Sequence, residues 1–144
     1  MADEAHEHIS VAAAPTRLFE LATDYERYPD WARDVKQVDI VERDSEGRGS
    51  RVEYRVAGLG KSIRYVLEYD YAEAPAAFSW HFVEGDWLRQ LDGRYGFEAE
   101  DGGTRVSYDL VVDVSAPLPG LIKRRAASMI MGTALKELKK EAER

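Results

Sequence analysis

The chain has 144 residues, a length typical of a single domain that buries roughly 68% of the surface its unfolded form exposes. Acidic side chains outnumber Lys and Arg by 27 to 20, and the formal charge of −7 argues against nucleic-acid binding and favours a neutral or apolar partner. The chain contains no cysteine, which excludes disulfides, thiolate catalysis and thiolate-bound zinc.

The N-terminal segment "MADEAHEH" is acidic, whereas a signal peptide begins with basic residues and continues with an apolar segment. No apolar run in the sequence approaches the roughly 18 residues of a membrane span, so we expect a cytoplasmic protein. The following segment, "EHISVAAAP", is predicted to form a short strand that leads into a helix with Pro15 in its first turn. A second short helical segment is predicted around residues 25–31.

After residue 34, apolar and polar residues alternate with the period of two that is typical of half-buried strands. Short segments rich in Gly, Asp and Glu, such as "DSEGRG" and "DGG", interrupt this alternation and favour turns. The pattern predicts a long antiparallel meander with strands at residues 35–43, 51–57, 61–71, 76–84, 88–100 and 104–114.

Pro117 and Pro119 are predicted to end the last strand, and a C-terminal helix of about 25 residues follows. Seven strands at about 4.8 Å spacing make a sheet roughly 30 Å wide, whereas a helix with its side chains is only about 10–12 Å across. We therefore expect the sheet to curve around the helix and to leave a pocket or a space filled by large side chains. Gly93 and Gly96 indicate a bulge or sharp coiling within their strand.

The predicted strands gather aromatic residues, five of them tyrosines, on one face. These tyrosines are either plain core residues or lining residues, and a pocket with water or a polar-ended ligand satisfies buried phenols more easily than a dry core does. The aromatic cluster "DYERYPDW" is expected to close one end of this pocket. We predict that the ligand-binding residues are Trp31, Tyr54, Tyr65, Tyr69, Trp80, Tyr95, Tyr108 and Met129.

Three parts of the sequence resemble the START/SRPBCC superfamily, which includes the birch pollen allergen: "AAPTRLFELATDYERYPDW", "LDGRYGFEAEDGGTRVSYDL", and "PLPGLIKRRA" leading into "ALKELKKEAE". Within it, the chain is most similar to the polyketide cyclase/dehydrase and coenzyme-Q-binding-protein branch. The resemblance implies one α+β domain over residues 1–144 with the helix-grip fold. In this fold a curved seven-stranded antiparallel sheet wraps around a long C-terminal helix, and two short helices follow the first strand. Related proteins bind quinones, lipids or polyketides.

Ser62 and Arg64 are the best candidates for catalysis. The resemblance implies this role, because aromatase/cyclases of the family place a serine and an arginine at this spacing in the pocket, where the arginine would polarise a ketone. Along the strand, the side chains of Ser62 and Arg64 alternate with that of Tyr65 and therefore point to the opposite face of the sheet. This favours the solvent face for both residues, unless a bulge after Gly60 reverses the alternation. The apolar phase offers no convincing general base.

Glu4, His6 and His8 alternate on one face of the first strand, a pattern that would suit a divalent metal. Because all three come from one edge strand and no second element offers a partner, we expect neither a metal nor another cofactor. The C-terminal helix carries seven Lys and Arg residues against three Glu, which suits either transient contact with a membrane surface or a solvated helix face.

Three functions are compatible with these patterns. The leading hypothesis is that an internal cavity binds an apolar small molecule, such as a quinone, a lipid or a polyketide-like ring system, without a cofactor. The first alternative is a cofactor-independent polyketide aromatase/cyclase that acts without a metal. The second alternative is a module that binds a protein partner.

Overall fold

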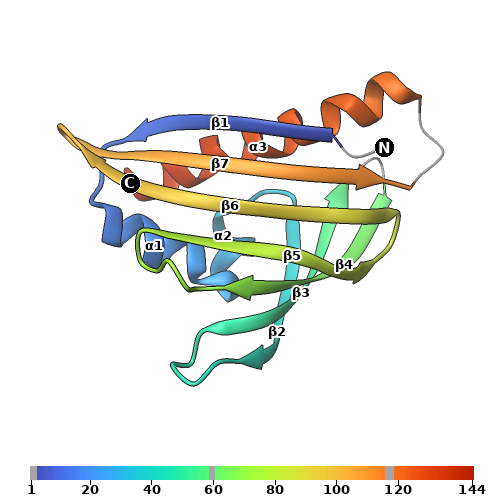
Figure 1. Ribbon diagram of the computed structural model, residues 1–144, viewed down its shortest axis with the longest axis horizontal. Helices are drawn as coiled ribbons and strands as arrows, with labels where there is room; N and C mark the ends of the chain where they lie inside the picture. The colour runs from blue at the N-terminus through green and yellow to red at the C-terminus, as the bar shows by residue number, and fades with distance from the viewer. Residues whose placement is uncertain (1–2, 59–60, 116–118) are drawn as a thin grey trace.

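The helices and strands form one curved antiparallel sheet with a long helix on its concave side (Figure 1). The computed structural model describes residues 3–58, 61–115 and 119–144, so the predicted strand end at Pro117 lies outside the described residues. Within these ranges the elements are, in chain order, β1 (Asp3–Val11), α1 (Pro15–Thr23), the 3-10 helix η1 (Tyr25–Arg27), α2 (Tyr28–Trp31), β2 (Val35–Arg43), β3 (Gly49–Gly58), β4 (Lys61–Asp70), β5 (Ala77–Gly85), β6 (Leu88–Glu100), β7 (Gly103–Val114) and α3 (Gly120–Ala142).

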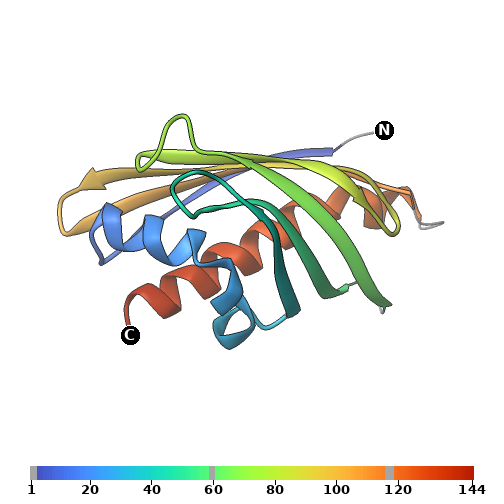
Figure 2. The same cartoon turned by 90° about the horizontal axis from the view of Figure 1, so that it is seen from below.

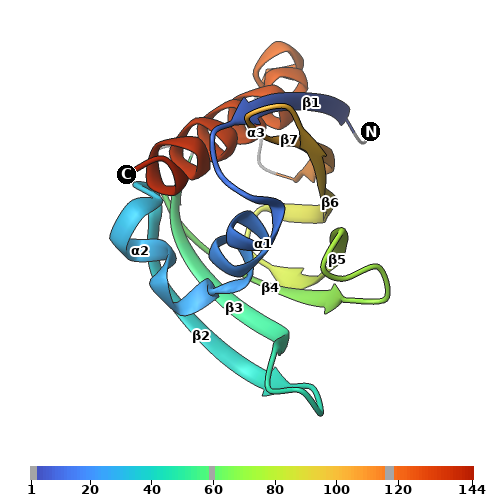
Figure 3. The same ribbon diagram turned by 90° about the vertical axis from the view of Figure 1, so that its left-hand side faces the viewer.

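The order of the strands in the sheet is β1-β7-β6-β5-β4-β3-β2, with every neighbouring pair antiparallel. Strands β2 to β7 therefore form a meander, and β1 adds to its end by pairing with β7 from Asp3 opposite Val112 to Val11 opposite Thr104. Figure 3 shows the sheet curving from β1 and β7 round to β2, with α1, α2 and α3 on the inner side. This arrangement confirms the predicted helix-grip fold.

The alternation of the strands decides which side chains enter the core. In β7 every second residue from Thr104 to Val114 is buried, because successive side chains of a strand point to opposite faces. Helix α3 contributes Met131, Leu135 and Leu138, whose spacing of four and three residues places them on one helix face. Each fully buried side chain of this size stabilises the fold by about 1.5–3 kcal/mol.

Hydrogen bonds fasten the C-terminal half of α3 beside the sheet, along which the helix runs in Figure 2. Lys139 Nζ donates to the carbonyl oxygen of Ser10 at 2.7 Å, and a carboxylate oxygen of Glu143 accepts from the amide of Ala12 at 2.8 Å. On the other side of the helix, Glu137 accepts from the amide of Arg33 at 2.9 Å, next to α2. These bonds tie α3 to the turn after β1 and to the turn before β2.

The predicted bulge at Gly93 and Gly96 is not found in the pairing of β6 with β7, which is unbroken across both glycines and has its register shift between Leu88 and Gln90. Pairing of β6 with β5 ends at Gly93, opposite Trp80, so the predicted alternative of sharp coiling stays a prediction. Gly93 is needed for another reason, because a Cβ atom there would lie 2.3 Å from Cζ2 of Trp80. The glycine gives the indole room to lie across the neighbouring strand.

Candidate ligand-binding cavity

A cavity of about 420 Å³ lies between the concave face of the sheet and helices α2 and α3. This volume is within the range of small-molecule sites in proteins, about 300–1,000 Å³. Its walls are largely apolar, and the aromatic residues that line it are Tyr28, Trp31, Tyr54, Tyr65, Tyr69, Phe78, Trp80, Tyr95 and Tyr108.

All eight predicted ligand-binding residues line this cavity: Trp31, Tyr54, Tyr65, Tyr69, Trp80, Tyr95, Tyr108 and Met129. Their contact with a ligand stays a prediction. Of the cluster "DYERYPDW", Tyr28 and Trp31 line the cavity, whereas Tyr25 is fully buried in the core beside them.

The mouth of the cavity lies between α3 and the ends of β2 and β3. The lining residues Met129 and Ile130 are 66% and 40% exposed, and Asp34 and Ala57 on the opposite side of the mouth are also exposed. Glu137 also lines the cavity, although it is not among the residues predicted from the sequence. A signal was present, because Met129, Thr133 and Glu137 follow one another at four-residue spacing and so share one face of the helix.

Some of the phenol groups around the cavity bond to one another or to the backbone. The hydroxyl groups of Tyr54 and Tyr69 share a hydrogen bond of 2.5 Å, and the hydroxyl of Tyr28 donates to the carbonyl oxygen of Ala22. The hydroxyl groups of Tyr25 and Tyr71, which are not lining residues, are 2.7 Å apart. Tyr54 and Tyr69 come from neighbouring strands, but the direct partner of Tyr54 in the sheet is Tyr65, so the first of these bonds joins two long side chains across the register.

Three lining tyrosines, Tyr65, Tyr95 and Tyr108, make no hydrogen bond through their hydroxyl groups to any described residue. Removal from water raises the pKa of each of these phenols above its usual value, because burial disfavours the charged phenolate. All three therefore keep their protons at neutral pH. They are hydrogen-bond donors without a protein acceptor.

The ionisable groups of the lining, apart from tyrosines, are two carboxylates at the mouth, Asp34 and Glu137. Among the described lining residues there is no Lys, Arg or His. Such a set of groups can bind and orient an uncharged molecule, but it offers no histidine or buried carboxylate as a proton acceptor.

Ser62 and Arg64 lie on the outer face of the sheet and do not line the cavity. Pairing of β3 with β4 is unbroken from Gly58 opposite Lys61 onwards, so the phase of β4 is not reversed; Gly60 itself lies outside the described residues. The guanidinium group of Arg64 instead contacts the carboxylates of Glu53 at 2.7 Å and Glu84 at 3.1 Å. The catalytic alternative cannot depend on these two residues.

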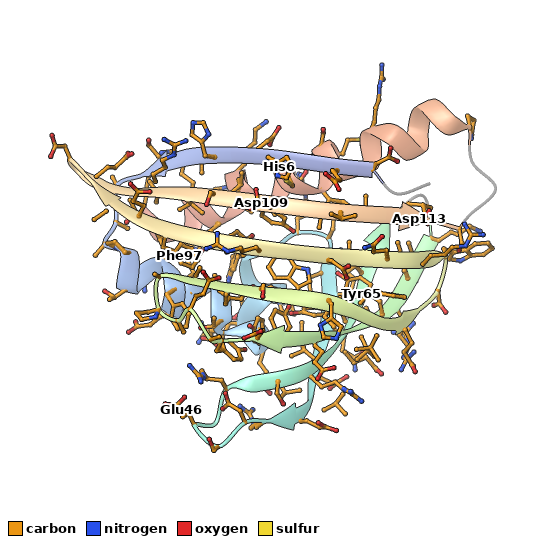
Figure 4. All side chains as sticks on the ribbon, in the orientation of Figure 1. His6, Glu46, Tyr65, Phe97, Asp109 and Asp113 are labelled. Carbon is orange, nitrogen blue, oxygen red and sulfur yellow. The ribbon has the colours of Figure 1, made fainter. Side chains whose placement is uncertain are left out.

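The histidines face solvent. His6 Nδ1 lies 2.8 Å from Oδ1 of Asp109 on the outer face of β1 and β7, where Figure 4 labels both residues. His8 and His81 are exposed. The described residues include no group of three or more His, Cys, Asp or Glu side chains that could hold a metal ion.

A second hollow of about 530 Å³ lies open to solvent near the turn between β2 and β3. Its lining includes charged side chains, among them Arg48, which lies 2.9 Å from Asp44, and Glu68, which lies 3.3 Å from His81. A polar, open depression of this kind does not suit an apolar ligand.

Two cations at the C-terminal end of the chain, Lys139 of α3 and Arg144 after it, take part in bonds within the chain. Lys139 contacts Ser10 and Glu143, and Arg144 lies 2.9 Å from Glu141. Arg125, Lys136 and Lys140 are exposed. Contact of this helix with a membrane surface stays a prediction, and no described helix is long and apolar enough to span a bilayer.

The sequence matches a family model described as "Polyketide cyclase / dehydrase and lipid transport" over residues 3–143. The chain belongs to this family. Membership in the polyketide cyclase/dehydrase and lipid transport family confirms the predicted superfamily, whereas the coenzyme-Q-binding part of the predicted branch stays a prediction. No functionally curated protein matches the chain significantly.

Solved structures of similar shape belong to proteins with different descriptions. A START superfamily protein from Mycobacterium smegmatis has 24% identity and a TM-score of 0.89, with 97% of each chain covered. The Zhui aromatase/cyclase from Streptomyces sp. R1128 has 16% identity and a TM-score of 0.84, with 100% of this chain and 95% of that chain covered. A protein from Thermus thermophilus has 24% identity and a TM-score of 0.78, with 99% of this chain and 97% of that chain covered. At such identities the similarity shows the fold of this family member.

Proposed function

We propose that this protein binds an apolar small molecule in the internal cavity and releases it chemically unchanged. The observation that carries the proposal is the lining itself, which is mainly aromatic and aliphatic and includes several tyrosines. Membership in a family that includes lipid transport proteins supports the same function.

The size of the cavity suits a ring system. An apolar cavity of about 150 Å³ holds one benzene molecule. The volume of about 420 Å³ therefore corresponds to roughly two to three fused rings. A quinone or a polyketide-like compound has these dimensions, and of a long-chain lipid only part would fit inside.

Removal of water from such a ligand supplies the affinity. Each Å² of apolar ligand surface that is buried contributes about 25 cal/mol to the binding free energy. The exposed side chains of Met129 and Ile130 make the mouth apolar, so an apolar ligand can enter there. The phenol groups then orient the ligand, because each unpartnered donor gains an acceptor when a ligand oxygen approaches it.

A cyclase function is the second candidate, and one observation favours it: the same fold serves as an aromatase/cyclase in Streptomyces sp. R1128. In this chain the donors available to polarise a ketone would be the tyrosine hydroxyl groups, since Arg64 lies outside the cavity. Incubation with a poly-β-ketone substrate analogue tests this function. A product distribution equal to that without protein would contradict it.

The test of ligand binding is to purify the protein from its native host, denature it and identify the released compounds by mass spectrometry. We expect a recurrent ring compound. A thermal-shift panel of quinones, lipids and polyketides complements this test, because a ligand at 100 times its Kd stabilises the fold by about 2.7 kcal/mol. Repeated absence of a released compound together with no stabilisation would favour a protein partner instead.

A further inference from the structure

The polar groups of the cavity restrict the chemistry of its ligand. Tyr95 of β6 and Tyr108 of β7 pair directly across the two strands, and their ring centroids are 4.5 Å apart. Both side chains are more than nine-tenths buried, at 7% and 6% exposure. Tyr65 of β4 adds a third hydroxyl group from another wall.

These three residues line the cavity, and no hydrogen bond joins their hydroxyl groups to a described residue. A ligand that displaces water from these hydroxyl groups loses affinity unless it supplies acceptor oxygens in place of the water. A plain hydrocarbon of the same shape would leave all three donors unsatisfied. The cavity therefore favours molecules that carry acceptor oxygens at two positions, near the Tyr95 and Tyr108 pair and near Tyr65.

The charges around the cavity oppose an anion. Asp34 and Glu137 line the mouth, and no described lining residue is cationic. A carboxylate that enters an apolar cavity loses its hydration, and without a cationic partner this loss is not compensated.

We propose that the ligand is an uncharged ring compound with carbonyl oxygens, such as a ketone or quinone, held by the hydroxyl groups of Tyr65, Tyr95 and Tyr108, and that carboxylates of the same size are rejected. This specificity rests on the proposed function. The proposed specificity limits the ligand to neutral ring compounds with carbonyl oxygens. A cavity that binds fatty acids would have to accept a carboxylate, which this cavity is proposed to reject.

Four compounds of nearly equal size test the specificity by calorimetry with the wild-type chain. They are 2-methylnaphthalene without acceptors, 2-methyl-1,4-naphthoquinone with two, methyl 2-naphthoate as a neutral ester, and 2-naphthoate as its anion. We expect the quinone to bind about tenfold more tightly than the hydrocarbon, as one or two net hydrogen bonds supply. We expect the ester to bind at least tenfold more tightly than the anion, because only the anion loses charge hydration.

Variants locate the effect. The double substitution Tyr95→Phe with Tyr108→Phe is expected to lower affinity for the quinone about tenfold and to leave affinity for 2-methylnaphthalene unchanged. Tyr71→Phe is the matched control, because its hydroxyl group bonds to Tyr25 and to the carbonyl oxygen of Gly49 and the residue does not line the cavity. Circular dichroism verifies that each variant is folded.

The outcomes separate the two proposals. If none of the four compounds binds, small-molecule binding itself is wrong for ring systems of this size, and the specificity falls with it. If the anion binds as tightly as the ester, or if the double substitution weakens the hydrocarbon and the quinone alike, binding stands and the specificity is wrong.

Discussion

The indole ring of Trp80 lies against Gly93, its direct partner on the neighbouring strand. A Cβ atom at Gly93 would come within 2.3 Å of Cζ2 and 2.6 Å of Cε2 of this ring. Real Cβ atoms do not approach other atoms so closely, so a larger residue at this position displaces the indole. Because Trp80 lines the cavity, Gly93 controls how much of the enclosed volume the tryptophan leaves free.

Gly93→Ala is expected to push Trp80 into the cavity and to reduce its volume. Overpacking of this kind costs about 1–3 kcal/mol of the free energy of unfolding. Affinity for two-ring and three-ring probes is expected to fall, and the three-ring probe should lose more. Chemical denaturation and calorimetric titration measure the two effects.

A second substitution distinguishes displacement of the indole from general damage to the sheet. Trp80→Phe shortens the side chain, so the pair Gly93→Ala with Trp80→Phe should recover part of the lost affinity, as a double-mutant cycle reveals. Simple addition of the two losses would count against this account. Gly132→Ala in α3 is the glycine control, since no atom lies within 4 Å of its added Cβ, and about 0.5–1 kcal/mol of stabilisation is expected.

Alkaline pH is expected to destabilise the fold through its buried tyrosines. Burial raises the pKa of Tyr54, Tyr69, Tyr95 and Tyr108 well above the usual value near 10. Above pH 10 the unfolded chain loses phenol protons that the folded chain keeps, so each such group lowers the free energy of unfolding by about 1.4 kcal/mol per pH unit. The stabilisation that these buried tyrosines contribute is fully present below pH 10 and is lost as the pH rises above it.

Urea denaturation at pH values from 8 to 11.5, together with phenolate absorbance, measures this dependence. Absorbance of the buried phenolates should rise only with loss of the near-UV circular dichroism signal. Titration of all tyrosines near pH 10 in a chain that remains folded would show that the phenols are accessible to solvent.

Arg64→Ala and Ser62→Ala are expected to leave ligand affinity unchanged, because both residues lie outside the cavity. Arg64 is one-third exposed and pairs with Glu53 and Glu84, so its loss should lower the free energy of unfolding by about 1 kcal/mol or less. Binding of 2-methyl-1,4-naphthoquinone by each variant is the measurement. A tenfold loss of affinity in a folded Arg64→Ala protein would place this residue back in the site.

The bond between Glu143 and the amide of Ala12 is expected to hold the end of α3 in place. This backbone hydrogen bond, with help from Lys139, lowers the pKa of Glu143. A lowered pKa stabilises the fold above the pKa of the unfolded carboxyl group, and this stabilisation disappears as the pH falls below it. Glu143→Gln should therefore speed hydrogen exchange at the Ala12 amide at pH 7 and have less effect at low pH.

Glu141→Gln is the control for this prediction, since Glu141 contacts Arg144 at the same helix end and no hydrogen bond joins it to β1. Equal exchange rates at Ala12 in wild type, Glu143→Gln and Glu141→Gln would contradict the role of Glu143.

Local patterns were sufficient for much of the fold. The predicted bounds of β2 and β6 agree with the structure, and those of β4 and β7 differ by one residue. The alternation of apolar and polar residues and the residues of turns each involve only a few neighbouring positions, so both can be recognised in a single sequence. The bulge predicted at Gly93 and Gly96 is absent from the pairing of β6 with β7. Gly93 instead makes room for Trp80, which lies 13 residues earlier in the sequence, and such a contact between strands leaves no local pattern.

Some features of the cavity could likewise be predicted from the sequence, whereas others depend on the tertiary structure. Strand phase alone placed Tyr54, Tyr65, Tyr69, Tyr95 and Tyr108 on the concave face, since side chains alternate strictly along a strand. Which phenols have partners could not be predicted from strand pairing: Tyr65 is the direct partner of Tyr54 in the sheet, yet the hydroxyl of Tyr54 bonds to Tyr69, and no hydrogen bond joins the hydroxyl of Tyr65 to a described residue. Likewise, Asp34 and Glu137 reach one mouth only because α3 packs next to α2 and the turn before β2. Contacts between distant segments arise from packing of the whole chain, and they decide which donors and charges a ligand would meet.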